Sequence, residues 1–230
     1  MPPELTILKA TDRWVAIDKP SGLCSVPGVG PDSQDNARAR LQELYPNARG
    51  AITVHRLDMD TSGVLLMALD EPTHRALSIQ FQDREVAKRY VALLHGHLDR
   101  DAGVIELPLR PDLTNRPYQI VDFDQGKPAQ TRYRVLECAT CGTLGRVTRV
   151  EFEPITGRSH QLRVHAAARA TIVHNGAPRP GGLHSPIVGD NLYSQRDTPS
   201  AARLMLHAEQ LTFTDPVSGD RVRIASSVPF

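Results

Sequence analysis

The pattern of apolar and polar residues along the chain predicts many short strands and few helices. Strands are predicted where runs of β-branched and other apolar residues stand between turn-forming residues. The predicted strands are 14–18, 51–54, 64–69, 88–95, 104–107, 119–122, 131–137, 146–152, 203–206, 210–214 and 221–225. The pair 131–137 and 146–152 is expected to form a hairpin across the glycines of 142–145.

Helical spacing of apolar residues occurs in three places. The predicted helices are 36–45, 70–84 and 160–170. Asn36 and Asp70 are suited to cap the first two, and Pro72 fits the first turn of the second. Pro46 is expected to end the first helix, because the residue before a proline avoids the helical conformation.

These elements favour an α+β fold. Strands in hairpin succession with a few flanking helices predict a mixed, mainly antiparallel sheet, and 230 residues suit one sizeable core. We expect a single domain over residues 1–230, without repeats or linkers. Residues 171–186 hold three prolines and three glycines and are expected to form an exposed excursion.

Charge is nearly balanced over the whole chain, at +1, but not along it. Residues 146–169 carry five arginines against two glutamates, a local balance of +3, whereas residues 1–75 carry eight basic and ten acidic residues. Such asymmetry indicates a one-sided basic surface. Only four of the 27 basic residues are lysines. The arginine bias fits phosphate recognition, and base composition of the genome explains it equally well.

The compartment is predicted from what the sequence does not contain. Three cysteines are too few for a disulfide framework, which favours a reducing compartment. Cys138 and Cys141 are spaced like half a zinc site, but no second pair exists, so no metal or redox use is expected. The chain has no run of ~18 apolar residues and no leader-like start, so we expect a cytoplasmic protein without a membrane span.

The segment His55–Gly63 concentrates reactive side chains between two predicted strands. Asp58 follows Arg56 and precedes two hydroxyl residues, so a neighbouring guanidinium is available to keep its carboxylate ionised as a nucleophile or base. A structural aspartate that binds local N–H groups is an equally good interpretation. Arg56 fits the part of a salt-bridge partner equally well.

A second group of polar residues stands where the chain enters the third predicted helix. Arg158, His160, Gln161 and Arg163 suit contacts to phosphates or base edges, and a solvated helix face is the alternative. In the strand 88–95, Tyr90 follows two basic residues. It suits stacking on a base, although a tyrosine in a strand more often belongs to the core.

Four motifs together resemble the RluA family of pseudouridine synthases. They are His55-Arg-Leu-Asp-Met-Asp-Thr-Ser-Gly63, Lys88-Arg-Tyr90, Gly157-Arg-Ser-His-Gln-Leu-Arg-Val-His165 and Gly189-Asp-Asn-Leu-Tyr193. The likeness extends from Lys19-Pro20-Ser21-Gly22 to Leu206-His207-Ala208. Asn115-Arg-Pro117 and Gly126-Lys-Pro-Ala-Gln130 further resemble the stand-alone member that modifies a tRNA anticodon loop and a large-subunit rRNA hairpin. No S4-type domain is expected before the catalytic domain.

The resemblance implies a role for each candidate residue. Asp58 is the catalytic carboxylate while uracil is detached, turned and rejoined through carbon. Arg56 fills the space left by a flipped uridine, Tyr90 stacks on the uracil and acts as a base, and Arg163 pairs with Asp58. The family needs no cofactor and no metal. The expected partners are the tRNA anticodon stem-loop and large-subunit rRNA, bound by a monomer.

Two rival functions remain open at this point. A non-catalytic RNA-binding module would use the same basic surface, and a hydrolase would release free uracil. The chain also departs from the family, since residues 171–186 and the turn 138–145 are longer than usual. Both lie near the expected RNA face, so they affect the choice of substrate more than the chemistry.

Overall fold

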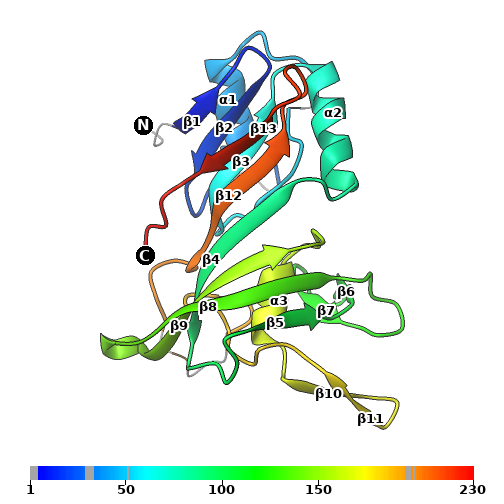
Figure 1. The fold of residues 1–230 in the computed structure, drawn as a ribbon, viewed down its shortest axis with the longest axis vertical. Helices are drawn as coiled ribbons and strands as arrows, with labels where there is room; N and C mark the ends of the chain where they lie inside the picture. Colours follow the sequence, from blue (N-terminus) through cyan, green and yellow to red (C-terminus); the bar gives the residue numbers. More distant parts are fainter. Residues whose placement is uncertain (1–4, 29–33, 51, 195–197, 199) are drawn as a thin grey trace. The chain divides into compact units, whose positions relative to one another are not determined.

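The chain forms two structural units, shown in the ribbon of Figure 1. The computed structural model describes residues 5–28, 34–50, 52–194, 198 and 200–230. The terminal unit consists of Met1–Lys88 and His207–Phe230, and the central unit consists of Arg89–Leu206. Each unit has its own buried core.

The terminal unit consists of a sheet and the helices α1 and α2. Its strands lie in the order β1-β2-β3-β12, with β13 on β12, and the pair β3 and β12 is parallel while the others are antiparallel. The core surrounds Trp14, whose ring meets Phe213 edge-on at a centroid distance of 5.1 Å. Its elements are β1 Thr6–Ala10, β2 Trp14–Lys19, α1 Ala37–Leu44, β3 Ser62–Ala68, α2 Glu71–Gln82, β12 Leu206–Thr214 and β13 Arg221–Ala225.

The central unit is an antiparallel sheet in the order β4-β9-β8-β5, with α3 packed on it and two small hairpins beside it. Phe152 of β9 and Leu162 of α3 belong to one buried apolar cluster. Its elements are β4 Ala87–His95, β5 Ala102–Glu106, β6 Leu109–Pro111, β7 Gln119–Val121, β8 Gln130–Cys141, η2 Gly142–Leu144, β9 Gly145–Pro154, α3 Gln161–Ala167, β10 Thr171–His174 and β11 Ala177–Pro180.

Most of the predicted elements are confirmed, and so is the α+β class with a mainly antiparallel sheet. Asn36 caps α1 by accepting from the amide of Ala39 at 3.0 Å, and Asp70 caps α2 through the amide of Thr73 at 2.8 Å. Strands β8 and β9 form the predicted hairpin, and both Cys138 and Cys141 lie exposed near its turn. None of the helices in the described residues is long and apolar enough to cross a membrane.

The predicted strand 51–54 is wrong for the residues that are described, 52–54. Only one bridge, Thr53 to Met67, joins this segment to β3, together with the bond from the amide of Ala68 to the carbonyl of Ile52. The next N–H of β3 along this edge, that of Leu66, goes to the side chain of His55 at 3.0 Å. A side chain therefore replaces the backbone pairing that a strand requires.

The excursion 171–186 is largely exposed, as predicted, and it also contains the hairpin of β10 and β11. Two further predictions need correction. Helix α3 ends at Ala167, because the chain must turn there to enter that hairpin. The strands predicted at 203–206 and 210–214 are one strand, β12, which begins at Leu206. The sequence pattern did not predict β1 or β6, both of which are short.

Gly63 allows β3 and β12 to lie close together, which yields the first prediction. Its φ is +111°, and a Cβ atom would lie 2.3 Å from the carbonyl oxygen of Ala208. We expect Gly63→Ala to lower the free energy of unfolding by ~3 kcal/mol or more, because backbone must move in addition to the strained φ. Urea denaturation measures this change.

The matched control is Gly22→Ala. Gly22 also has a positive φ, +85°, but nothing lies within 4 Å of its added Cβ. The control should lose only ~1 kcal/mol through backbone strain. Equal losses in the two variants would contradict the close approach at Gly63.

Candidate active site

The loop His55–Gly63 is hydrogen-bonded to a buried lysine. Lys19, at the end of β2, is fully buried, and its Nζ donates to the carbonyls of Pro20, Leu23 and Met59 at 2.9, 2.7 and 2.9 Å. An ammonium has three hydrogens and no lone pair, so three carbonyls match it. One of them belongs to the residue that directly follows Asp58, so Lys19 fixes the main chain at the candidate catalytic position.

Two serines complete this attachment. Ser25 Oγ donates to the carbonyl of Leu57 at 2.7 Å and accepts from its amide at 3.0 Å. Ser21 Oγ donates to the carbonyl of Asp60 at 2.7 Å. The main chain on both sides of Asp58 is therefore tied to the segment 19–25, and charged or paired hydrogen bonds of this kind each contribute on the order of 1 kcal/mol.

The side chain of Asp58 is not used by this framework. Its main-chain carbonyl accepts from the amide of Thr61 at 3.1 Å, and its side chain is half-buried. Among the described residues of the terminal unit, none donates a hydrogen bond to its carboxylate. Arg56 is exposed. The loop is thus stabilised through its backbone, and the alternative of a structural aspartate that binds local N–H groups receives no support from this unit.

His55 is a structural residue at the start of the loop. Its ring stacks on Phe81 of α2 at a centroid distance of 4.5 Å, and its Nε2 accepts from the amide of Leu66. Burial, with the nearby Lys88 ammonium, lowers the pKa of His55 to about 3. The ring is therefore neutral near pH 7, with its acceptor nitrogen already engaged. Burial and Arg84 in turn lower the pKa of Lys88 to about 8.

In the central unit, Arg163 forms a buried ion pair with Asp190. Nε and Nη2 of the guanidinium donate to the two carboxylate oxygens at 2.8 and 2.7 Å, and Arg163 is only 2% exposed. Asp190 also accepts from the amides of Leu192 and Tyr193. The guanidinium lies 5.4 Å from the centre of the Tyr193 ring. An arginine that donates two hydrogen bonds to one carboxylate and packs on an aromatic ring is held in one orientation.

Gln161 is saturated within the protein. Its Oε1 accepts from the Thr156 hydroxyl at 2.7 Å and from the Arg158 amide at 2.9 Å, and its Nε2 donates to the Gln130 carbonyl and the Thr131 hydroxyl. The side chain is 4% exposed. An amide has two donor and two acceptor positions, and all four are engaged. Gln161 therefore holds the turn before α3, and it is not presented to a ligand as the sequence pattern suggested.

His165, a residue of α3, belongs to the same hydrogen-bond network. Its Nδ1 lies 3.0 Å from the Thr131 hydroxyl and its Nε2 lies 3.4 Å from the carbonyl of Leu107. Because a carbonyl only accepts, Nε2 carries the hydrogen and Nδ1 accepts from Thr131. Burial lowers the pKa of His165 to about 4, against the opposing effect of the Leu107 carbonyl. The ring is neutral and fully buried.

The other candidates of the central unit are more accessible. Arg158 is half-buried and its Nε donates to the carbonyl of Pro128 at 3.1 Å. His160 precedes α3 with a left-handed φ of +52°, and its Nδ1 lies 2.8 Å from the Tyr193 hydroxyl. Tyr90 lies on β4 opposite Phe152, half-buried against the core of the unit. The unit thus brings Arg158, His160 and Arg163 to one end of α3.

Several residues of the site were not recognised from the pattern alone. Lys19, Asp190 and Tyr193 were noted only as members of motifs, and Ser25 was not noted. A lysine directly before Pro-Ser-Gly and a Gly-Asp pair were the available signals, but their partners are 40 and 27 residues away in sequence. The predicted pair between Arg163 and Asp58 stays a prediction.

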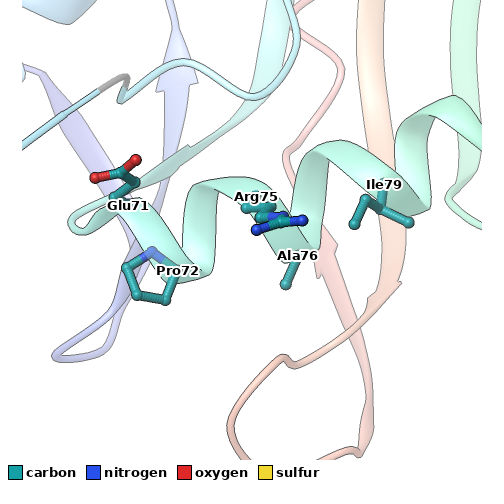
Figure 2. A pocket seen from close by; sticks show the side chains of 5 residues that line it. All are labelled: Glu71, Pro72, Arg75, Ala76 and Ile79. Atoms are coloured by element: carbon teal, nitrogen blue, oxygen red, sulfur yellow. The ribbon is translucent and has the colours of Figure 1, made fainter.

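A shallow hollow is lined by side chains of α2. Its volume is about 450 Å³. Figure 2 shows the lining side chains on successive turns of the helix: Glu71, Pro72, Arg75, Ala76 and Ile79. None of the predicted site residues lines it, so the candidate site does not depend on this hollow.

Replacing Lys19 tests the attachment of the loop. In Lys19→Met the carbonyls of Pro20 and Leu23 lose the ammonium donor, that of Leu23 in a buried position, and the carbonyl of Met59 keeps only the amide of Gly22. We expect the free energy of unfolding to fall by ~3 kcal/mol or more, since unsatisfied buried acceptors are costly. Hydrogen exchange at the amide of Thr61 should also become faster, because the loop is less constrained.

Lys127→Met is the matched control, because Lys127 is exposed. It should change stability by less than about 0.5 kcal/mol, as surface substitutions usually do. If Lys19→Met were as stable as this control, the loop would not depend on the buried amine.

The buried histidines predict a dependence of stability on pH. The unfolded chain takes up a proton at His165 near pH 6.5, whereas the folded protein resists it down to about pH 4. The stability is therefore complete above pH 6.5 and falls as the pH drops toward 4, because the unfolded state binds more protons there. His165→Gln should make this dependence shallower by up to about 1.4 kcal/mol per pH unit.

Urea titrations of the two proteins between pH 7 and pH 4.5 measure the difference in slope. His55 acts in the same direction and remains in both proteins, so some dependence persists. His97→Gln, which removes an exposed histidine, is the control. Parallel curves for the wild type and His165→Gln would show that His165 is not the group involved.

Comparisons with known proteins identify the family. Residues 13–168 match the RNA pseudouridylate synthase family. The chain is 43% identical over 229 residues to the dual-specificity RNA pseudouridine synthase RluA of Escherichia coli K12, covering 99% of this chain and 95% of the relative. The protein of the same name from Yersinia pestis is 42% identical over 227 residues, which cover 98% of this chain and all of the relative.

Solved structures agree with this match. Human RNA pseudouridylate synthase domain containing 1 is 28% identical, with a TM-score of 0.77 that covers 100% of this chain and 87% of the human chain. Human RNA pseudouridylate synthase domain containing 4 is 26% identical, with a TM-score of 0.71 over 97% of this chain and 88% of the human chain. The resemblance seen in the motifs is confirmed, and the chain belongs to the RluA-type RNA pseudouridine synthases, which are isomerases.

Proposed function

We propose that this protein converts uridine to pseudouridine in structured RNA and that Asp58 is its catalytic carboxylate. The observation that carries the proposal is the main-chain attachment of the loop by Lys19 and Ser25. It fixes the position of Asp58 while its carboxylate takes no part in the framework. A reactive group on a rigid support is what catalysis by positioning requires.

The reaction is an isomerisation. The glycosidic bond from C1′ to N1 of uracil breaks, the base turns, a bond from C1′ to C5 forms, and the hydrogen of C5 is replaced while N1 gains one. Nothing is oxidised or reduced. Flipping the uridine out of its stack costs a few kcal/mol, and an unpaired loop base costs less. Arg56, which is exposed beside Asp58, is proposed to fill the space that the uridine leaves.

Tyr90 and Arg163 are proposed to complete the chemistry. Tyr90 would stack on the uracil and serve as a base, and Arg163 would keep Asp58 ionised. Because Asp190 takes the edge formed by Nε and Nη2, a pair with Asp58 would use the Nη1 side of the guanidinium. Asp58 belongs to the terminal unit, and Tyr90 and Arg163 belong to the central unit. The proposal that the three residues act together is therefore supported by the sequence motifs.

The proposed substrates are a tRNA anticodon stem-loop and a hairpin of large-subunit rRNA. The support is the name of the relatives, dual-specificity RNA pseudouridine synthase, and the motifs around Pro117 and Lys127. Arg158 and His160 are proposed to contact the RNA, with Gln161 holding the turn on which Arg158 lies. We further propose that the protein acts as a monomer in the cytoplasm.

Asp58→Asn tests the proposed function. The substitution keeps the size of the side chain and removes its charge, so pseudouridine formation should fall by at least ~10³-fold, as expected when a covalent or acid-base catalyst is lost. RNA affinity should stay within about twofold. Pseudouridine is measured in anticodon stem-loop and rRNA hairpin transcripts after incubation with each protein.

Asp60→Asn, two residues away on the same loop, is the control and should retain activity. Activity of Asp58→Asn near that of the wild type would contradict the catalytic role. Bound RNA without pseudouridine from the wild type would indicate a non-catalytic RNA-binding module. Free uracil in the product mixture would indicate hydrolysis of the glycosidic bond.

A further inference from the structure

A long part of the central unit contains no acidic residue. Residues 154–189 include four arginines and four histidines but neither aspartate nor glutamate. Arg163 is neutralised by Asp190, whereas Arg169 and Arg179 are exposed. This basic segment includes α3 and the hairpin formed by β10 and β11. The hairpin follows α3 directly in the chain.

The hairpin is a regular two-stranded ribbon. Its register runs from Thr171 opposite Pro180 to His174 opposite Ala177. The connecting residues Asn175 and Gly176 both have positive φ, +51° and +74°, as a tight hairpin turn requires. Figure 1 shows the ribbon extending beyond the sheet of its own unit. Four residues per strand give it a reach of roughly 13 Å.

The base of the hairpin is fixed to the end of α3. The amides of Gly182, Leu183 and Ser185 donate to the carbonyls of Arg169, His165 and Ala166 at 2.9 to 3.0 Å. A Cβ on Gly182 would lie 2.3 Å from the His165 carbonyl oxygen, so only glycine permits this approach. The last carbonyls of α3 thereby receive the donors that a helix end lacks. The base of the ribbon is therefore hydrogen-bonded to the end of the helix that carries Arg163.

The hairpin also contacts the loop that follows β7. His174 packs against Phe123 at a centroid distance of 5.1 Å, and its Nε2 lies 3.4 Å from a carboxylate oxygen of Asp124. Asp124 is thus paired with His174. Arg169 and Arg179 are exposed, and neither forms an ion pair with Asp124.

We propose that the hairpin of β10 and β11 is an additional RNA-binding element that grips the phosphate backbone of the stem next to the target uridine. This inference rests on the proposed function. Guanidinium groups bind phosphate with two parallel hydrogen bonds, and a basic ribbon without acids suits a polyanion better than a protein surface. Val173 is exposed, but a single exposed apolar side chain needs no partner.

The double variant Arg169→Ala/Arg179→Ala tests the inference in the full-length protein. The dissociation constant is measured by fluorescence anisotropy with a labelled anticodon stem-loop transcript and with full-length tRNA transcript, over a series of salt concentrations. We expect a roughly tenfold weaker affinity and a salt slope that is smaller by about 1.5, as two lost phosphate contacts imply. The turnover number at saturating RNA should not change.

The matched control is Arg75→Ala/Arg223→Ala, which removes two exposed arginines of the terminal unit. It should leave affinity and salt slope close to those of the wild type. Equal melting temperatures of both variants and the wild type show that the fold is retained. An effect of the control equal to that of the hairpin variant would overturn the inference, because the charges would then act without regard to place.

The other outcomes separate the inference from the proposed function. If the wild type forms pseudouridine while the hairpin variant keeps its affinity and salt slope, the hairpin does not bind RNA and the proposed function stands. If the turnover number falls while affinity is unchanged, the hairpin acts through α3, which also overturns the inference. Absence of pseudouridine with the wild type on both transcripts counts against the proposed function, whatever the binding data show.

Discussion

The buried amine of Lys19 is the interaction on which the candidate catalytic loop depends. Three carbonyls surround it, and one belongs to Met59, the residue after Asp58. Placing an ammonium in a fully buried position is costly unless each hydrogen finds an acceptor. The segment 19–25 and the loop must therefore fold against each other in one arrangement, and this requirement fixes the backbone that carries Asp58.

The two units use the same strategy with different groups. In the terminal unit one buried cation, Lys19, donates hydrogen bonds to main-chain carbonyls. In the central unit one buried carboxylate, Asp190, accepts hydrogen bonds from a guanidinium and two amides. Each arrangement leaves a polar side chain in a single orientation at the end of an element. Broken pairs of this kind typically cost ~3–5 kcal/mol, so removal of Asp190 would disturb both the fold and the orientation of Arg163.

The sequence predicted local structure well where the signal is local. Asn36 and Asp70 cap the helices as predicted, because a cap and its amide are three residues apart. Prediction failed where a distant partner decides the outcome. The segment 52–54 has strand-like residues, yet the His55 side chain takes the N–H of Leu66 that a paired strand would use. The hairpin at Asn175 and Gly176 has a local turn signal, which the surrounding prolines and glycines obscured.

The same distinction applies to the site. Asp58 and Arg163 were identified by residue type and motif, but the roles of their neighbours follow from contacts that no short window contains. Gln161 is the clearest example. Its residue type suits a contact to RNA, but its side-chain amide is fully engaged in hydrogen bonds within the protein. Its four bonds join the turn before α3 to β8, and Thr131 passes the network on to His165. The helix that presents Arg163 is thus held at its start by Gln161 and at its end by the hairpin, so its position is set by polar contacts at both ends as well as by apolar packing.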